Sequence, residues 1–174
     1  GSSAGFESES NDSKATADSM SSGTAIKGEL ASSSDVDYYK FTTSGSGSVS
    51  ISLDSPLNSS LGYFKFALYD SDNNNLGEYT TGKDLTVSIG ISAAGTYHLL
   101  LQSGSWYNAG QYSLTTSFTA GSSAGFESES NDSTATADSI SSGAAIKGQL
   151  ASSSDVDYYK FTTSGSGSVS ISLD

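Results

Sequence analysis

The sequence contains no cysteine, no arginine and a single proline among its 174 residues. Without cysteine the chain has no disulfide framework, so its composition does not indicate a redox compartment. Seven lysines face 19 acidic residues, which gives a formal net charge of −12. This balance argues against the basic surfaces that bind nucleic acid or anionic membranes, and it favours solubility or the binding of divalent cations. The sequence also lacks 18 consecutive apolar residues, so no membrane insertion is expected.

What the sequence does contain is a segment of 54 residues that occurs twice. Residues 121–174 repeat residues 1–54 at all but four positions, with an offset of 120 residues, the size of one small domain. The differences are Lys14/Thr134, Met20/Ile140, Thr24/Ala144 and Glu29/Gln149. We therefore divide the chain into a linker (1–5), a complete domain (6–119), a second linker (120–125) and the first half of a near-identical repeat (126–174).

Apolar residues alternate with polar ones through most of the chain, which is typical of half-buried β-strands. In GSVSISLD, for example, Val49, Ile51 and Leu53 share one face and serines take the other. About eight such strands, separated by Gly and Asn clusters, predict an all-β fold, an antiparallel β-sandwich or jelly roll. One short N-terminal helical turn is predicted after Asp12 or Ser13, either of which would cap it.

Several motifs occur in an order that resembles the bacterial pre-peptidase C-terminal domain. They are E-x-E-x-N-D (7–12), A-T-A (15–17), G-x-L (28–30), D-x-D-Y-Y-x-F (35–41), A-L-Y-D-S-D (67–72), A-A-G-T-Y (93–97) and G-Q-Y-S-L (110–114). The resemblance covers residues 6–118, and the second copy carries its first half. It implies a non-catalytic β-sandwich of the kind appended to secreted peptidases, similar to the collagen-binding domains of bacterial collagenases.

The resemblance also implies a calcium site in each copy. The candidate ligands of the first copy are Glu7, Glu9, Asn11, Asp12, Asp35 and Asp37. Those of the second copy are Glu127, Glu129, Asn131, Asp132, Asp155 and Asp157.

Elementary electrostatics supports the calcium interpretation. Ca²⁺ takes six to eight hard oxygen ligands, and five carboxylates brought together without counter-charge would repel one another and raise their pKa values. The alternative is a solvated acidic linker whose charges never meet. A second metal candidate, D-S-D-N-N-N (70–75), has EF-hand-like spacing but lacks the glycine and the final glutamate, so a polar hairpin turn is the simpler interpretation. His98 is the only histidine, and no catalytic motif is expected.

The half repeat needs a partner, because a segment of that length buries too little apolar surface to stand alone. Residues 55–119 are able to complete a sandwich with either 1–54 or 121–174, and the sequence leaves this open. We expect the remaining half to be completed head to tail by a copy of itself or by the next repeat of an array. Head-to-tail contacts that do not close into a ring build a filament.

Two functions follow from different features. The near-identical repeat favours a structural module of a secreted or cell-surface protein, an adhesin stalk or an extracellular filament. The family resemblance alone favours a substrate-binding accessory domain of a secreted peptidase, with collagen or another extracellular protein or polysaccharide as ligand. Export would require a signal upstream of the sequence.

Overall fold

The computed structural model describes residues 5–121 and 125–174, and it is all-β. The predicted fold class is therefore confirmed, but the predicted number of strands is wrong. The described residues form eleven strands: β1 (Asp18–Ser19), β2 (Ala25–Gly28), β3 (Val36–Thr43), β4 (Gly47–Asp54), β5 (Ser59–Tyr69), β6 (Asn75–Gly82), β7 (Leu85–Ile91), β8 (Gly95–Ser103), β9 (Tyr112–Ala120), β10 (Asp138–Ser139) and β11 (Tyr159–Lys160).

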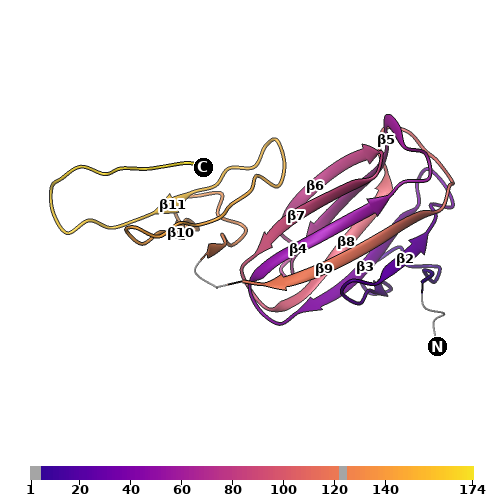
Figure 1. Cartoon of the computed structure of the whole chain (residues 1–174), viewed down its shortest axis with the longest axis horizontal. Helices are drawn as coiled ribbons and strands as arrows, with labels where there is room; N and C mark the ends of the chain where they lie inside the picture. Colours follow the sequence, from indigo (N-terminus) through magenta and orange to yellow (C-terminus); the bar gives the residue numbers. More distant parts are fainter. Residues whose placement is uncertain (1–4, 122–124) are drawn as a thin grey trace.

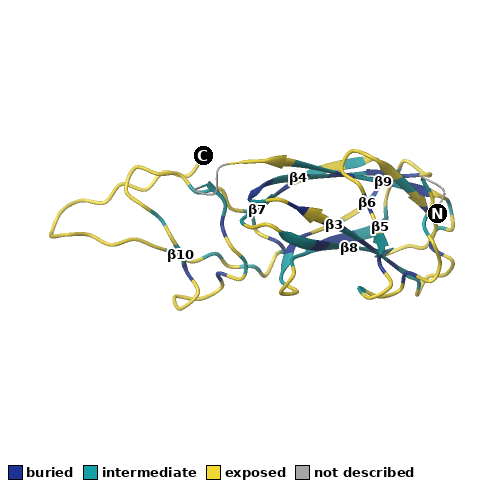
Figure 2. Ribbon diagram, turned by 90° about the horizontal axis from the view of Figure 1, so that it is seen from below, coloured by how far each residue is buried: buried dark blue, intermediate teal, exposed yellow. Residues whose placement is uncertain are grey.

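Strands β1 to β9 form two sheets that pack face to face as a sandwich (Figures 1 and 2). The five-stranded sheet has the order β1-β3-β8-β5-β6 and the four-stranded sheet the order β2-β9-β4-β7. All pairs are antiparallel except β1 with β3. The alternating apolar positions of both sheets fill the space between them, as the sequence pattern predicts. The fully buried side chains of this core include Tyr39, Val49, Ile51, Phe64, Phe66, Leu68, Ile89, Leu99, Leu101, Tyr112 and Leu114.

The predicted N-terminal helical turn is wrong. Residues 13–16 form one hydrogen-bonded turn, in which the Thr16 amide donates to the Ser13 carbonyl at 3.1 Å. The chain then continues as β1, whose Ser19 lies opposite Lys40 of β3, and the Met20 amide donates to the Lys40 carbonyl at 2.8 Å. Pairing with an existing strand satisfies more backbone groups than one isolated helical turn, so tertiary context outweighs the local helical preference.

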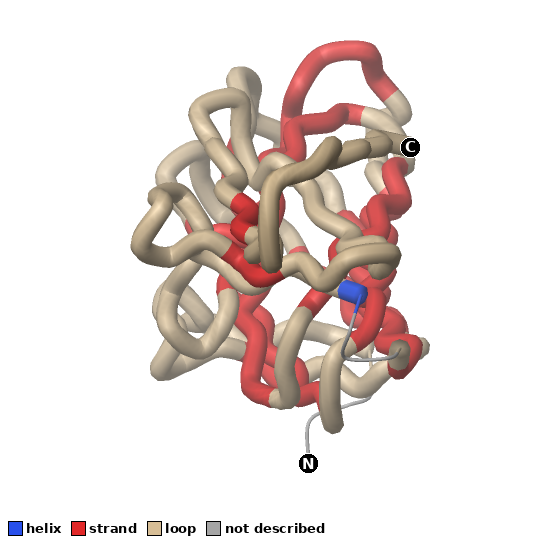
Figure 3. Tube along the Cα trace, turned by 90° about the vertical axis from the view of Figure 1, so that its left-hand side faces the viewer, coloured by secondary structure: helices blue, strands red, loops and turns tan. Residues whose placement is uncertain are grey.

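The second copy forms much less regular structure than the first. Its strands β10 and β11 pair in parallel with the register of β1 and β3, and Asp138 lies opposite Tyr159 as Asp18 lies opposite Tyr39. Residues 161–174 are exposed and belong to no strand (Figures 2 and 3). Residues 55–119 thus complete a sandwich with the first copy. Within the described residues, no helix is long and apolar enough to span a membrane.

The two predicted linkers lie partly outside the described residues. Residues 1–4 and 122–124 are not described. Strand β9 extends to Ala120, and the Gly121 amide donates to the Ser46 carbonyl at 3.0 Å, so the sandwich includes residues at the start of the second predicted linker.

Candidate metal centre

The N-terminal acidic segment is held against the sandwich by backbone hydrogen bonds to β2. Phe6 forms a parallel bridge with Lys27, in which the Glu7 amide donates to the Lys27 carbonyl at 2.9 Å and the Lys27 amide donates to the Gly5 carbonyl at 2.8 Å. The Glu7 carboxylate in turn accepts a hydrogen bond from the Glu29 amide at 2.6 Å. This docking directs Glu7 toward the inward face of β3.

Three of the predicted ligands converge at this point. Carboxylate oxygens of Glu7, Glu9 and Asp37 lie within 4.8 Å of one another. Asp37 belongs to the inward-facing positions of β3, as its alternation with Tyr39 predicts, and it is fully buried. Asn11 is also fully buried, and its amide nitrogen lies 3.4 Å from Glu7 Oε2. The acidic segment is therefore a compact cluster, and its interpretation as a solvated linker is wrong.

Two tyrosine hydroxyls form the buried side of the cluster. Tyr39 donates to Glu7 Oε2 at 2.5 Å, and Tyr112 of β9 donates to Asp37 Oδ2. The two hydroxyl oxygens are 2.6 Å apart. Gly28 makes this approach possible, because a Cβ at that position would overlap the Glu7 carboxylate and both hydroxyls.

Burial and mutual repulsion disfavour negative charge in this cluster. Burial raises the pKa of Asp37 to about 8, the hydrogen bond from Tyr112 opposes the rise, and the charges of Glu7 and Asp35 add to it. Burial also raises the pKa of Glu9, with further contributions from the charges of Asp35 and Glu7. A bound cation would reverse this penalty, because it supplies the missing positive charge.

The remaining predicted ligands of the first copy have different positions. Asp35 lies in the loop before β3, where its carboxylate accepts hydrogen bonds from the Ala31 amide at 2.6 Å and the Val36 amide at 3.0 Å. Asp12 is exposed and is not part of the three-carboxylate group. In the second copy, however, the equivalent Asp132 does join Glu129 and Asp155 in a group of the same size.

Sequence reasoning missed three residues that shape this site. Asp18 Oδ2 accepts hydrogen bonds from the Ser8 amide at 2.7 Å and from the Asn11 side chain at 3.4 Å, so Asp18 holds the acidic segment in place. Tyr39 was predictable only as a core residue, and Tyr112 is distant in sequence from every other member. The only local signal is that both tyrosines occupy inward positions of their strands, where a buried hydroxyl needs a hydrogen-bond partner.

The second copy builds the same arrangement. Glu127, Glu129 and Asp157 form the equivalent group, and the Ser128 amide donates to Asp138 Oδ2 at 2.7 Å. Burial raises the pKa of Glu129 to about 7 and that of Asp157 to about 6, with nearby carboxylates adding to both. The site therefore forms from residues 125–160 without a completed sandwich around it.

Both clusters contain buried oxygens without hydrogen-bond partners. Among the described residues, eight buried side-chain polar atoms have no partner, and five belong to the predicted ligand sets. These five are Asn11 Oδ1, Asp37 Oδ1, Glu129 Oε1, Asn131 Oδ1 and Asp157 Oδ1. Buried polar atoms are nearly always hydrogen-bonded, so this concentration of unsatisfied oxygens is unusual. Carboxylate and amide oxygens are the donors that Ca²⁺ prefers, and the donor set fits that ion.

The second metal candidate, the turn between β5 and β6, is a polar hairpin turn. Asp70 Oδ1 accepts hydrogen bonds from the amides of Asp72 at 2.9 Å and Asn74 at 2.8 Å, and Asp70 Oδ2 accepts one from the Asn74 side chain at 2.9 Å. Both carboxylate oxygens of Asp70 therefore accept hydrogen bonds from groups of the turn itself. The simpler interpretation of this sequence is correct.

Comparison with known proteins finds a match to one family model, which supports the resemblance seen in the motifs, and similar folds among solved structures. The structure of the pre-peptidase C-terminal domain of collagenase from Bacillus anthracis is 19% identical, with a TM-score of 0.49, and the match covers 57% of this chain and 93% of that one. The K3 cleaved adhesin domain of Lys-gingipain from Porphyromonas gingivalis W83 is 11% identical, with a TM-score of 0.34, and the match covers 53% of this chain and 71% of that domain. No curated protein sequence matches the chain. The family model of the bacterial pre-peptidase C-terminal domain matches residues 35–103, which comprise β3 to β8 and the D-x-D motif.

Proposed function

We propose that the chain is a non-catalytic, calcium-stabilised structural repeat of a secreted or cell-surface protein, an adhesin stalk or an extracellular filament. In this proposal the half repeat 126–174 is completed by a neighbouring copy or by the next repeat of an array. One observation carries it. Val169, Ile171 and Leu173 expose 54%, 82% and 100% of their surface, whereas the same residues of the first copy, Val49, Ile51 and Leu53, expose 0%, 0% and 2%.

The apolar residues of this exposed segment retain their alternation. Strand β4 of the first copy lies in the centre of its sheet, hydrogen-bonded to β7 on one side and β9 on the other. The equivalent residues 167–174 have the same sequence and no such partners in the described chain. A segment with the alternation of a strand, an apolar face and unpaired backbone groups is a template for pairing with another chain. A copy of residues 55–119 supplies the strands that fit it. In the next repeat of an array those strands are free, and in a neighbouring chain they become available when residues 126–174 replace that chain's residues 6–54.

In the same proposal calcium stabilises the start of each repeat. Glu7, Glu9, Asn11 and Asp37 would hold the ion in the first copy, and their equivalents would hold it in the second. The ion supplies positive charge to carboxylates that otherwise repel one another. The chain's own residues do the positioning: Asp18 holds the acidic segment, and the two tyrosines orient Glu7 and Asp37.

Assembly is tested by substituting one residue on each face of the exposed segment. Ile171→Asp introduces a charge on the apolar face, and Ser172→Asp introduces the same charge on the polar face as a control. We expect the unsubstituted chain and Ser172→Asp to form multimers in sedimentation and head-to-tail chains in electron micrographs. Ile171→Asp should remain monomeric with an intact first sandwich by circular dichroism. An unsubstituted chain that stays monomeric at high concentration contradicts association between chains.

The array form of the proposal has its own test. A second copy of residues 55–120 appended after Asp174 should fold against residues 126–174 and fill the open half. We expect this extended chain to be monomeric and to protect the amides of residues 167–174 from hydrogen exchange. If those amides exchange as fast as in the original chain, the half repeat is not an unfinished sandwich.

A second function has a specific observation in its favour. Trp106 and Tyr107 in the loop after β8 expose 55% and 39% of their surface, and the Trp106 amide donates to Gly62 beside the exposed Leu61. Exposed aromatic groups of this kind are typical of binding surfaces, which suits a substrate-binding accessory domain of a secreted peptidase. Trp106→Ala would weaken pull-down by collagen or polysaccharide in that case. Retention of neither material by the unsubstituted chain would remove this alternative.

A further inference from the structure

A few residues of the second copy are buried by the first sandwich, whereas the equivalent residues of the first copy are more exposed. Most residues of 156–173 are more exposed than their equivalents, because the second sandwich is incomplete. A small group shows the opposite. Phe126, Glu127, Glu129, Gln149 and Ala151 are each more buried than their first-copy equivalents, which are Phe6, Glu7, Glu9, Glu29 and Ala31. These five residues form one face, which we call the docking face.

The docking face packs against the end of the first sandwich where β6 begins and β7 ends (Figure 1). Three hydrogen bonds join them. The Glu78 amide donates to the Ala151 carbonyl at 3.0 Å, the Asn74 side chain donates to the Glu129 carbonyl at 3.0 Å, and Gln149 Nε2 donates to the Leu76 carbonyl at 2.6 Å. Strand β6 is an edge of its sheet, so the contact also covers backbone groups that would otherwise remain unpaired.

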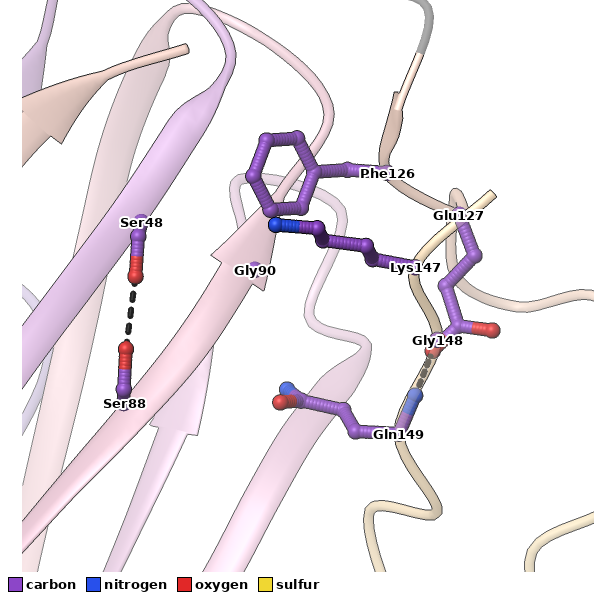
Figure 4. Close-up of a pocket in the computed structure, with 8 residues that line it drawn as sticks. All are labelled: Ser48, Ser88, Gly90, Phe126, Glu127, Lys147, Gly148 and Gln149. Atoms are coloured by element: carbon purple, nitrogen blue, oxygen red, sulfur yellow. Dashed lines mark hydrogen bonds between the residues drawn. The ribbon is translucent and has the colours of Figure 1, made fainter. Parts of the chain in front are cut away.

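Phe126 provides the apolar contact. Its ring lies against Gly90 of β7, where a Cβ would overlap the ring, and close to Gly121, where a Cβ would be 3.0 Å from Phe126 Cε2 (Figure 4). A cleft of about 240 Å³ lies beside it between the two copies, lined by Ser48, Ser88 and Gly90 on one side and by second-copy residues on the other. Among residues 5–121 and 125–174 the equivalent Phe6 has no such neighbour, and it exposes 52% of its surface.

One of the four sequence differences between the copies lies in the docking face. Gln149 replaces Glu29, and only the amide form carries a donor for the Leu76 carbonyl. An ionised glutamate at 149 would place a negative charge against that carbonyl oxygen. The other three second-copy residues, Thr134, Ile140 and Ala144, are outside the contact.

We propose that the docking face is an encoded interface between consecutive repeats, with Phe126 as its apolar anchor and Gln149 as its specificity residue. Its occupant is the β6–β7 end of the preceding repeat. This inference deepens the proposed function, because it rests on consecutive repeats forming one array, but it does not rest on calcium. The three hydrogen bonds use three backbone carbonyls as acceptors and one backbone amide and two side-chain amides as donors, and no carboxylate oxygen of the acidic cluster takes part.

The absence of cysteine allows a direct measurement of docking. Spin labels at Ser60→Cys and Ser141→Cys, both exposed positions, report the distance between the first sandwich and the second copy by electron–electron double resonance. Labelled chain is diluted with unlabelled chain so that only distances within one molecule contribute. We expect one narrow distance distribution, present with calcium and with EGTA.

Two pairs of matched variants test the assignment. Gln149→Glu removes a partly buried hydrogen bond and should lower the ratio of docked to undocked chains about tenfold, whereas Glu29→Gln should leave it unchanged. Phe126→Ala should broaden the distribution, and Phe6→Ala should not. A broad distribution in the unsubstituted chain overturns the inference, as does an unchanged distribution in both Gln149→Glu and Phe126→Ala.

The distance measurement and the assembly experiment test the two proposals separately. A narrow distribution in a chain that never assembles supports the docking face and contradicts assembly between chains. A broad distribution in a chain that assembles contradicts the docking face and supports assembly between chains. Circular dichroism of each variant confirms that the first sandwich is folded.

Discussion

Residues 6–54 and 126–174 have nearly the same sequence in two different surroundings, and they differ in which parts are ordered. In both copies the acidic segment keeps its hydrogen bonds: the Tyr38 amide to the Asn11 carbonyl and the Tyr158 amide to the Asn131 carbonyl are both 2.9 Å. The long strands β3 and β4 form only in the first copy, where β8 and β9 are available to pair with them. In the second copy the same sequence forms only the two-residue strands β10 and β11. The acidic site is therefore encoded locally, whereas the long strands depend on residues 55–120.

The strongest test of this comparison is one substitution made in each copy. Ile51→Ala removes a fully buried side chain from the core and should lower the free energy of unfolding by about 3 kcal/mol. Ile171→Ala alters an exposed side chain and should change it by less than about 0.5 kcal/mol. Urea denaturation of the monomeric chain, followed by Trp106 fluorescence, measures both. Equal losses would show that the two copies are equally buried.

Calcium removal should affect the two copies differently. At a calcium concentration one hundred times Kd, one bound ion stabilises the folded state by about 2.7 kcal/mol. EGTA should remove this stabilisation from the first sandwich. Asp37→Asn should remove it too, and in EGTA this variant should be at least as stable as the unsubstituted chain, because it lacks a buried carboxylate. Asp157→Asn, the matched change in the second copy, should leave the calcium-dependent melting of the first sandwich intact.

The result that contradicts the calcium proposal is equally clear. A melting temperature that is the same with calcium and with EGTA, in a chain that retains no metal after dialysis, would show that the cluster is not a calcium site. The unsatisfied oxygens of Asn11 and Asp37 would then require another partner.

The pH dependence without calcium follows from the direction of the pKa shifts. The pKa of Asp37 rises from 3.8 to about 8 on folding, so its contribution to stability is complete below about pH 4 and is lost as the pH rises through 8. The raised pKa of Glu9 acts in the same direction. Thermal melts in EGTA should therefore show a decline in stability between about pH 4 and about pH 8. Saturating calcium should remove most of it, and a decline of the same size in calcium would contradict the linkage.

The parts predictable from the sequence are those that depend on local pattern. Alternation correctly predicted the inward faces of the strands, and a period of two puts Asp37 on the same face as Tyr39, which is why Asp37 of the D-x-D motif points into the sandwich. Short strands such as β1 carry no periodicity and were misassigned as a helical turn. The contribution of Tyr112 was not predictable, because it depends on the pairing of β9 with β2 and β4, far away in sequence.

Tyr112 therefore offers the finest test of the difference between the copies, since the second copy has no equivalent within this chain. Tyr112→Phe removes the hydroxyl that donates to Asp37 and that lowers its pKa. Loss of this hydrogen bond should lower stability by about 1 kcal/mol and should weaken calcium binding at the first site near pH 7, because more of Asp37 is protonated. Calorimetric titration should show the second site unchanged.

Tyr97→Phe is the control for this change. It removes a hydroxyl that donates to the Ala93 carbonyl at 2.8 Å and that has no hydrogen bond to the first cluster. It should cost similar stability without altering calcium affinity. If Tyr112→Phe behaves in the same way as Tyr97→Phe, the hydroxyl serves the core alone. The first and second sites would then be equivalent, and completing the sandwich around a site would add nothing to the cluster that residues 125–160 form while docked on the first sandwich.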